Sequence, residues 1–159
     1  MGEVVKKDEL IKIVANLKKE GKKVVFTNGC FDILHIGHVR YLKASSKCGD
    51  VLIVGLNSDK SVRAIKGETR PINNENDRAE LLSELNFVDY VVIFDENSPS
   101  KLLEEIKPTI YTKGADYTLE TLPEAKVAKE NNIEVKFIEL VQGKSTTNII
   151  KTINSDKNN

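Results

Sequence analysis

The sequence has no apolar run of the ~18 residues that a membrane helix needs, and its first residues lack the apolar segment of a signal peptide. It has only two cysteines, Cys30 and Cys48, and they do not form a zinc set. Because no export signal precedes them, we expect both to be reduced thiols. These absences predict a cytoplasmic protein with no membrane partner.

An excess of charge of either sign is also absent. The chain of 159 residues carries 24 basic and 24 acidic side chains, so its net charge is zero. A general nucleic-acid-binding protein usually has a basic excess, so we expect no nucleic-acid partner. Hydrophobic residues make up 40% of the chain, which is enough for one core. We expect a single domain over residues 1–153, with an N-terminal helix within residues 8–21, and a disordered polar tail over residues 154–159.

Short β-branched runs alternate with helical patterns along the whole chain. The predicted strands are residues 24–27, 51–56, 90–94, 109–112 and 133–140. The predicted helices are residues 8–20, 37–47, 58–65, 75–86 (with Leu81, Leu82 and Leu85 facing inward), one that opens at Ser98-Pro99 and ends before Pro108, 122–131 and 145–153.

This alternation predicts the fold class. Strands that are apolar on both faces and alternate with helices indicate a parallel sheet covered on both sides. We therefore predict a Rossmann-like, doubly wound α/β fold with five parallel strands. Such sheets bind ligands beyond the carboxyl ends of the strands, where the strand order reverses, so functional residues are expected there.

The segment 27–38 follows the first predicted strand and holds both histidines of the chain, as His35-Ile36-Gly37-His38 at the start of a helix. A helix N-terminus offers unpaired N–H groups and a partial positive charge, which attract phosphate. Gly37 would let a ligand approach the backbone, and the imidazoles could donate hydrogen bonds to phosphoryl oxygens. The alternatives are satisfied surface or core histidines, or a metal pair, although no nearby carboxylate or cysteine completes a zinc set.

The segment 143–148 follows the last predicted strand and begins Gly-Lys-Ser, like the end of a P-loop. Ile138 stands where a P-loop needs its first glycine, so that motif is absent. As plain structure, Ser145 is a suitable helix N-cap. Together with the histidine segment, a second phosphate-binding helix terminus is the preferred interpretation.

Two further segments contain residues suited to a nucleotide. Residues 66–71, followed by Arg78, supply three cations and a glycine that could fold over a polyphosphate, or could form a solvated charged loop. Residues 113–117 follow the fourth predicted strand. There, Gly114 permits close backbone approach, and the Asp116 carboxylate could hold a ribose hydroxyl.

Taken together, these residues resemble the cytidylyltransferase-like nucleotidyltransferases. The segment 27–38 is similar to the signature of that family, and the likeness extends over residues 22–153. The strings Lys-Gly-Glu-Thr-Arg-Pro (66–71) and Ser-Thr-Thr-Asn-Ile-Ile (145–150) are the more specific ones, and they most resemble the adenylyltransferase domain of bifunctional ADP-heptose synthases. Because the chain has no room for the sugar kinase half, we expect a stand-alone heptose-1-phosphate adenylyltransferase.

One departure bears on the choice of nucleotide. The chain is also similar to glycerol-3-phosphate cytidylyltransferases, which carry Arg-Thr-x-Gly before the Ser-Thr pair, where this chain has residues 140–143 without an arginine. This difference favours ATP over CTP. A cytidylyltransferase for glycerol 3-phosphate or another alcohol phosphate is the alternative, and a non-catalytic nucleotide-binding module is a third hypothesis.

The resemblance implies transfer of AMP from ATP, carried with Mg²⁺, to a sugar 1-phosphate, with release of pyrophosphate; it also suggests a homodimer. The implied catalytic residues are His35, His38 and Lys66, with His38 and Lys66 at the α-phosphate. Asp116 would contact ribose, and Asp32 would orient the site. The residues expected to surround the nucleotide are Asn28, Gly29, Cys30, Phe31, Asp32, Gly37, Arg70, Arg78, Lys113, Gly114, Asp116, Ser145, Thr146 and Thr147.

Overall fold

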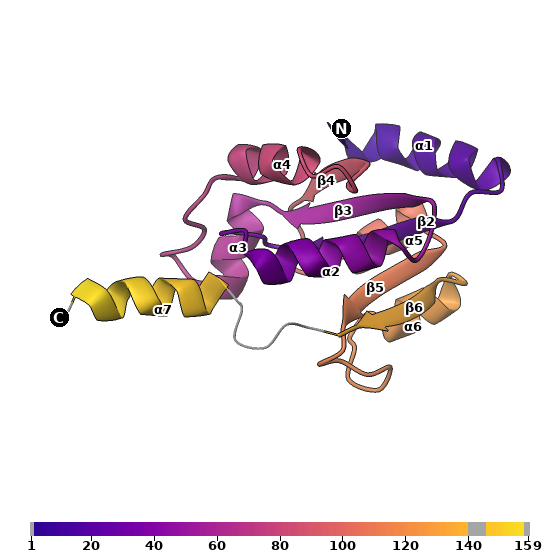
Figure 1. Ribbon diagram of the computed structural model, residues 1–159. Helices are drawn as coiled ribbons and strands as arrows, with labels where there is room; N and C mark the ends of the chain where they lie inside the picture. The colour runs from indigo at the N-terminus through magenta and orange to yellow at the C-terminus, as the bar shows by residue number, and fades with distance from the viewer. Residues whose placement is uncertain (1, 140–145, 158–159) are drawn as a thin grey trace.

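The structure, a computed structural model, describes residues 2–139 and 146–157. Within them, six strands form one parallel sheet in the order β1-β4-β3-β2-β5-β6 (Figure 1). The strands are β1 (Glu3–Val4), β2 (Val24–Gly29), β3 (Val51–Asn57), β4 (Tyr90–Phe94), β5 (Ile110–Gly114) and β6 (Glu134–Ile138). The helices are α1 (Lys7–Lys19), α2 (Ile36–Ser46), α3 (Asp59–Lys66), α4 (Glu75–Ser83), α5 (Ser100–Ile106), α6 (Ala125–Glu130) and α7 (Thr146–Lys157).

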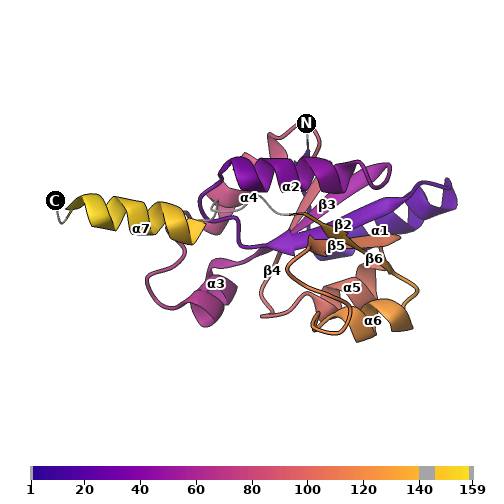
Figure 2. The same ribbon diagram turned by 60° about the horizontal axis from the view of Figure 1, so that its bottom comes forward.

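The central strands are buried on both faces because helices cover both sides of the sheet. One hydrophobic core contains Leu10 of α1, Leu103 of α5 and Ala128 of α6. The other contains Leu42 of α2 and Leu82 of α4. Figure 2 shows α2 and α4 on one side of the sheet and α5 and α6 on the other. The predicted doubly wound α/β fold is therefore confirmed.

The strand count differs from the prediction by one. All five predicted strands are present, and the sixth is β1, which pairs with β4 through Glu3↔Tyr90 and Val4↔Val91. A strand of two residues is too short to show a periodicity in the sequence, and it exists because the edge of β4 supplies its partners.

Two helices also differ from the prediction. Leu81 does not face inward: it is 49% exposed, whereas its neighbour Leu82 is fully buried. Helix α4 ends at Ser83 and turns Leu82 to the core, so adjacent Leu81 faces solvent. Helix α7 continues through residues 154–157, which were expected to belong to a disordered tail.

The strand order places the site. The chain runs from β2 to β3 and β4 on one side of β2, and β5 then lies on the other side of β2. The order therefore reverses between β2 and β5, which is where a doubly wound sheet opens a crevice. The segments at the ends of these two strands are the histidine segment and residues 113–117, which are two of the segments predicted to bind a nucleotide.

We predict that Gly55→Ala destabilises the fold because β3 has no room for a methyl group there. A Cβ on Gly55 would lie 2.5 Å from Cζ of Phe26, whose ring is fully buried. Overpacking of this kind costs about 1–3 kcal/mol, to be measured by urea unfolding. The exposed control Lys60→Ala should change stability by less than about 0.5 kcal/mol. Equal stability of the two variants would contradict the packing argument.

Candidate active site

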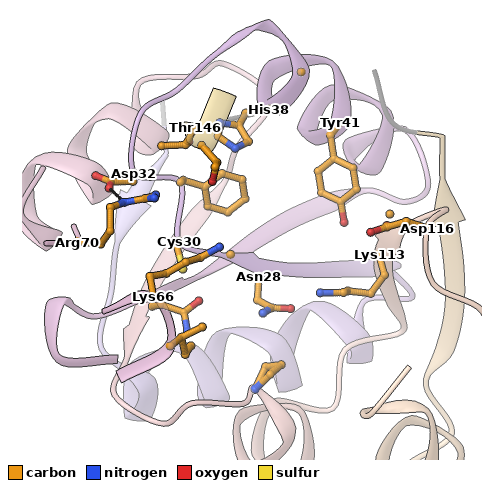
Figure 3. A pocket seen from close by; sticks show the side chains of 18 of the residues that line it. Asn28, Cys30, Asp32, His38, Tyr41, Lys66, Arg70, Lys113, Asp116 and Thr146 are labelled. Atoms are coloured by element: carbon orange, nitrogen blue, oxygen red, sulfur yellow. Dashed lines mark hydrogen bonds and ion pairs between the residues drawn. The ribbon is translucent and has the colours of Figure 1, made fainter. Parts of the chain in front are cut away.

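A cavity of about 530 Å³ opens at the carboxyl end of the sheet, at the predicted crevice (Figure 3). Most of the predicted site residues line it. These residues are Asn28, Gly29, Cys30, Phe31, Asp32, His35, Gly37, His38, Lys66, Arg70, Lys113, Gly114, Asp116, Thr146 and Thr147. Figure 3 shows Lys66 and Arg70 on one side of the cavity, Lys113 and Asp116 on the opposite side, and His38 and Thr146 along a third.

The two histidines are stacked at the start of α2. His35 is the N-cap of this helix, and its Nδ1 accepts a hydrogen bond of 3.4 Å from the backbone N–H of His38. The two rings lie 3.8 Å apart between centroids at an interplanar angle of 24°. The edge-on ring of Phe31 packs against His38, and a Cβ on Gly29 would come within 2.8 Å of the Phe31 ring. Gly29 thus makes room for the aromatic ring that holds His38 in place.

Burial changes the chemistry of His38. Removal from water, together with the charge of His35, lowers the pKa of His38 from 6.5 to about 4. His38 is therefore neutral at pH 7. Its Nδ1 is buried and has no hydrogen-bond partner among the described residues. Buried polar atoms normally have partners, so this nitrogen is available to a ligand in the cavity.

Asp32 holds the loop that carries Arg70. Its carboxylate accepts hydrogen bonds of 2.9 Å from the backbone N–H groups of Ile72 and Asn73, and one of 2.8 Å from Nε of Arg70. Burial by itself raises the pKa of Asp32. The hydrogen bonds from Asn73 and Ile72 and the charge of Arg70 lower it by more than burial raises it, so the pKa of Asp32 is below its usual value. Asp32 therefore stays ionised and orients Arg70 beside the cavity, consistent with the orienting role predicted for it.

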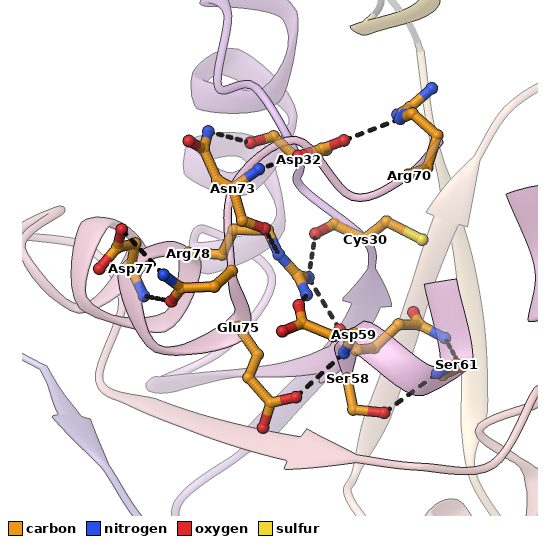
Figure 4. Close-up of polar contacts among 12 residues, drawn as sticks. Cys30, Asp32, Ser58, Asp59, Ser61, Arg70, Asn73, Glu75, Asp77 and Arg78 are labelled. Atoms are coloured by element: carbon orange, nitrogen blue, oxygen red, sulfur yellow. Dashed lines mark hydrogen bonds and ion pairs between the residues drawn. The ribbon is translucent and has the colours of Figure 1, made fainter. Parts of the chain in front are cut away.

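Arg78 is not among the described residues that line the cavity, although it was predicted to contact the nucleotide. Its side chain is completely buried. Its guanidinium donates hydrogen bonds of 2.7–2.9 Å to the backbone oxygens of Cys30, Asn57 and Asn73 and to the carboxylate of Asp59 (Figure 4). Because all of these bonds are made within the protein, Arg78 ties together the loops that form the cavity.

The floor of the cavity is a set of hydrogen bonds between strands and α2. The hydroxyl of Tyr111 donates to Oδ1 of Asn28 at 2.6 Å, so the Asn28 amide is left with its NH₂ group for the cavity. The hydroxyl of Tyr41 shares a hydrogen bond of 2.8 Å with Thr27 and donates one of 3.4 Å to Thr112. These bonds join β2, β5 and α2 beneath the cavity.

The first turn of α7 reaches the cavity edge. The hydroxyl of Thr146 donates a hydrogen bond of 3.0 Å to the backbone oxygen of Ile33, and its side chain is buried. Thr146 therefore attaches α7 to the histidine segment, and the exposed Thr147 also lines the cavity. The predicted site residue Ser145 lies outside the described residues.

Several cavity residues were not among the predicted site residues. They are Tyr41, Asn57, Ile65, Asn97, Pro99, Tyr117 and Glu124. Tyr117 lies in the segment 113–117, which was predicted to bind a nucleotide. Asn57 lies one residue after the predicted strand 51–56. The others have no motif around them and come to the cavity only through the fold. Glu124 is distinctive because it is a buried carboxylate, 7% exposed.

The part of the chain that the structure describes contains no cluster of three or more His, Cys, Asp or Glu side chains suited to a metal ion. None of its helices has the length and apolar character needed to cross a bilayer.

Comparison with known proteins identifies relatives. The model of a family described as cytidylyltransferase-like matches residues 26–156. Among curated proteins, the bifunctional protein HldE of Campylobacter concisus is 55% identical over 95% of this chain, and that of Geobacter metallireducens is 51% identical over 92%. The chain spans 31% and 30% of the lengths of these relatives, about a third of each.

A solved structure is also similar. The crystal structure described as the lipopolysaccharide core biosynthesis protein from Thermoplasma volcanium is 38% identical, with a TM-score of 0.62. The match covers 78% of this chain and all of that chain. This likeness agrees with the Rossmann-like fold.

We predict that Arg78→Lys lowers the free energy of unfolding by roughly 3 kcal/mol or more, because a lysine cannot reproduce the branched set of buried hydrogen bonds. Urea unfolding would measure the change. Arg63→Lys, an exposed arginine on α3, is the matched control and should leave stability within about 0.5 kcal/mol of wild type. A loss of less than about 1 kcal/mol for Arg78→Lys would argue against its clamping role.

We predict a pH response of His38 that can be followed by NMR titration of its ring protons. In the protein without ligand, the His38 ring should titrate with a midpoint at about pH 4. Inorganic tripolyphosphate should raise this midpoint, because a nearby anion favours the charged imidazole. Since the unfolded chain binds this proton near pH 6.5, the His38 contribution to stability is complete above 6.5 and is lost as pH falls towards 4. A free-protein midpoint near 6.5 would contradict the burial argument.

Proposed function

This chain belongs to the cytidylyltransferase-like family, and from that premise we propose that it is a nucleotidyltransferase that moves AMP from ATP to a sugar 1-phosphate. The preferred acceptor is D-glycero-D-manno-heptose 1-phosphate, which gives ADP-heptose and pyrophosphate. The likeness of the chain to HldE proteins, and its specific strings at residues 66–71 and 145–150, support this choice.

The observation that carries the proposal is the stacked histidine pair at the start of α2, which lines a cavity that also contains the cations Lys66 and Arg70. The N–H groups of the helix terminus and the neutral imidazole of His38 suit phosphoryl oxygens. Lys66 and Arg70 add positive charge on the other side of the same cavity (Figure 3). A nucleoside triphosphate needs such charge along its phosphates.

In the proposed reaction, an oxygen of the sugar phosphate attacks the α-phosphorus in line, forming a new phosphorus–oxygen bond as the bond to pyrophosphate breaks. A phosphate monoester is already anionic near neutral pH, so the chain needs no strong general base. Its residues would act by positioning the substrates and by stabilising charge on the α-phosphate and the leaving group. His35 and His38 are proposed to hold the nucleotide phosphates, with His38 and Lys66 at the α-phosphate. Arg70 is proposed to hold the outer phosphates or the acceptor phosphate.

The proposed co-substrate ATP would carry Mg²⁺ on its phosphates, where the ion would neutralise negative charge. The proposal also includes a cytoplasmic location, where ATP is available, and a homodimer. A sedimentation measurement at micromolar concentration would test the dimer.

A cytidylyltransferase for glycerol 3-phosphate is the second candidate, since the family takes its name from that chemistry. Pyrophosphate release should separate the two when ATP, CTP, GTP and UTP are each combined with sugar 1-phosphates and glycerol 3-phosphate. We expect release with ATP and heptose 1-phosphate only. Release with CTP and an alcohol phosphate would replace the proposed substrates, and nucleotide binding without any release would favour a binding module.

We predict that His38→Ala lowers kcat by roughly 10²–10³, by analogy with the loss of one preorganised donor to a developing oxyanion. The variant should stay folded, which circular dichroism would verify. Lys43→Ala, an exposed position on the same helix, should retain wild-type turnover. Near-wild-type turnover by a folded His38→Ala variant would remove His38 from the mechanism.

A further inference from the structure

Glu124 is a buried carboxylate for which the proposed phosphate chemistry has no use. It precedes α6, lines the cavity and is only 7% exposed. No described residue donates a hydrogen bond to its side chain. The protein itself therefore does not use this carboxylate as an acceptor, and a ligand in the cavity can donate hydrogen bonds to it.

Two neighbouring polar side chains on this side of the cavity, Tyr111 and Lys113, already have partners. The hydroxyl of Tyr111 donates to Asn28. The ammonium group of Lys113 lies 5.0 Å from the centroid of the Tyr117 ring, in a cation–π contact. Burial lowers the pKa of Lys113, and the charge of Glu124 opposes that shift, so the two side chains share one part of the cavity. Glu124 and Asp116 are thus the carboxylates on this side that accept no hydrogen bond from the described residues, and of the two only Glu124 is buried.

The chemistry of a carboxylate limits what can bind beside it. An ionised carboxylate only accepts hydrogen bonds and repels phosphate, so the phosphates belong near the histidines and Lys66. The Watson–Crick edge of adenine has an amino donor next to a ring nitrogen that is an acceptor. That nitrogen and a carboxylate oxygen would repel each other because both are acceptors. Two adjacent hydroxyl groups offer a donor to each carboxylate oxygen and meet no such opposition.

We infer that Glu124 determines specificity by accepting hydrogen bonds from adjacent hydroxyl groups of a bound carbohydrate ring. The inference rests on the proposed function, which supplies two such rings: the ribose of the nucleotide and the sugar of the acceptor. Both present the same chemistry, and direct binding measurements distinguish them. The exposed Asp116, which the sequence suggested for ribose, lies on the same side but is not buried.

The test is calorimetric binding of ATP, 2′-deoxyATP and 3′-deoxyATP with Mg²⁺ to the wild-type chain, to Glu124→Gln and to the exposed control Glu120→Gln. If ribose is the ligand of Glu124, wild type should prefer ATP to a deoxy analogue by about tenfold or more, as expected for a hydrogen bond to a charged group. Glu124→Gln should lose most of this preference, and Glu120→Gln should keep it. A purely structural role would weaken all three nucleotides equally.

Binding of the acceptor is measured by the same calorimetric method, with heptose 1-phosphate titrated in the presence of an α,β-methylene analogue of ATP. If the acceptor sugar is the ligand, Glu124→Gln should weaken its binding by about tenfold while ribose discrimination stays as in wild type. The inference is overturned if folded Glu124→Gln leaves both ribose discrimination and acceptor binding within about twofold of wild type. Should that variant fail to fold, Glu124→Asp repeats the test with the charge retained on a shorter side chain.

Turnover of the wild-type chain is measured in parallel, so that failure of the proposed adenylyltransferase activity can be distinguished from failure of the proposed role of Glu124. Absence of pyrophosphate release with ATP and heptose 1-phosphate would overturn the proposed substrates. The binding measurements need no turnover and would still report on Glu124.

Discussion

The buried guanidinium of Arg78 is the interaction on which the geometry of the cavity depends. It binds the backbone at Cys30, after β2, and at Asn57, the last residue of β3, and it also binds Asp59 at the start of α3. Loops at the carboxyl end of a sheet cannot form ladder hydrogen bonds, so their carbonyl groups need other donors. One planar group with several donors supplies them, and it thereby sets the relative positions of three segments (Figure 4).

Asp32 extends the same arrangement towards the ligand side. It accepts from the backbone of residues 72 and 73 and from Arg70, while Arg78 binds the backbone oxygen of residue 73. The second half of the loop after α3, from Arg70 to Asn73, is therefore held by two ionised side chains. A cation such as Arg70 that is positioned in advance loses less entropy when it meets an anion, which suits a site that binds polyphosphate.

The sides of the cavity differ in charge and in burial. The histidine side combines a helix N-terminus with an imidazole kept neutral by burial, and Lys66 and Arg70 lie on another side. The β5 side contains Lys113 together with the carboxylates Asp116 and Glu124, of which Glu124 is buried. This distribution favours phosphate near the histidines, Lys66 and Arg70, and hydroxyl groups beside the carboxylates, because like charges repel strongly where water is scarce.

The alternation of strands and helices, the parallel sheet and most of the residues around the cavity could be predicted from the amino-acid sequence. They follow from local patterns, because the carboxyl ends of the strands in a parallel sheet lie along one edge, whatever the conformation of the loops. The remaining features depend on contacts between distant segments. Arg78 and Arg70 look alike in the sequence, yet only the fold buries one as a clamp and leaves the other beside the cavity. The same holds for Glu124 and β1, since burial and edge pairing depend on segments far away in the chain, which no local pattern records.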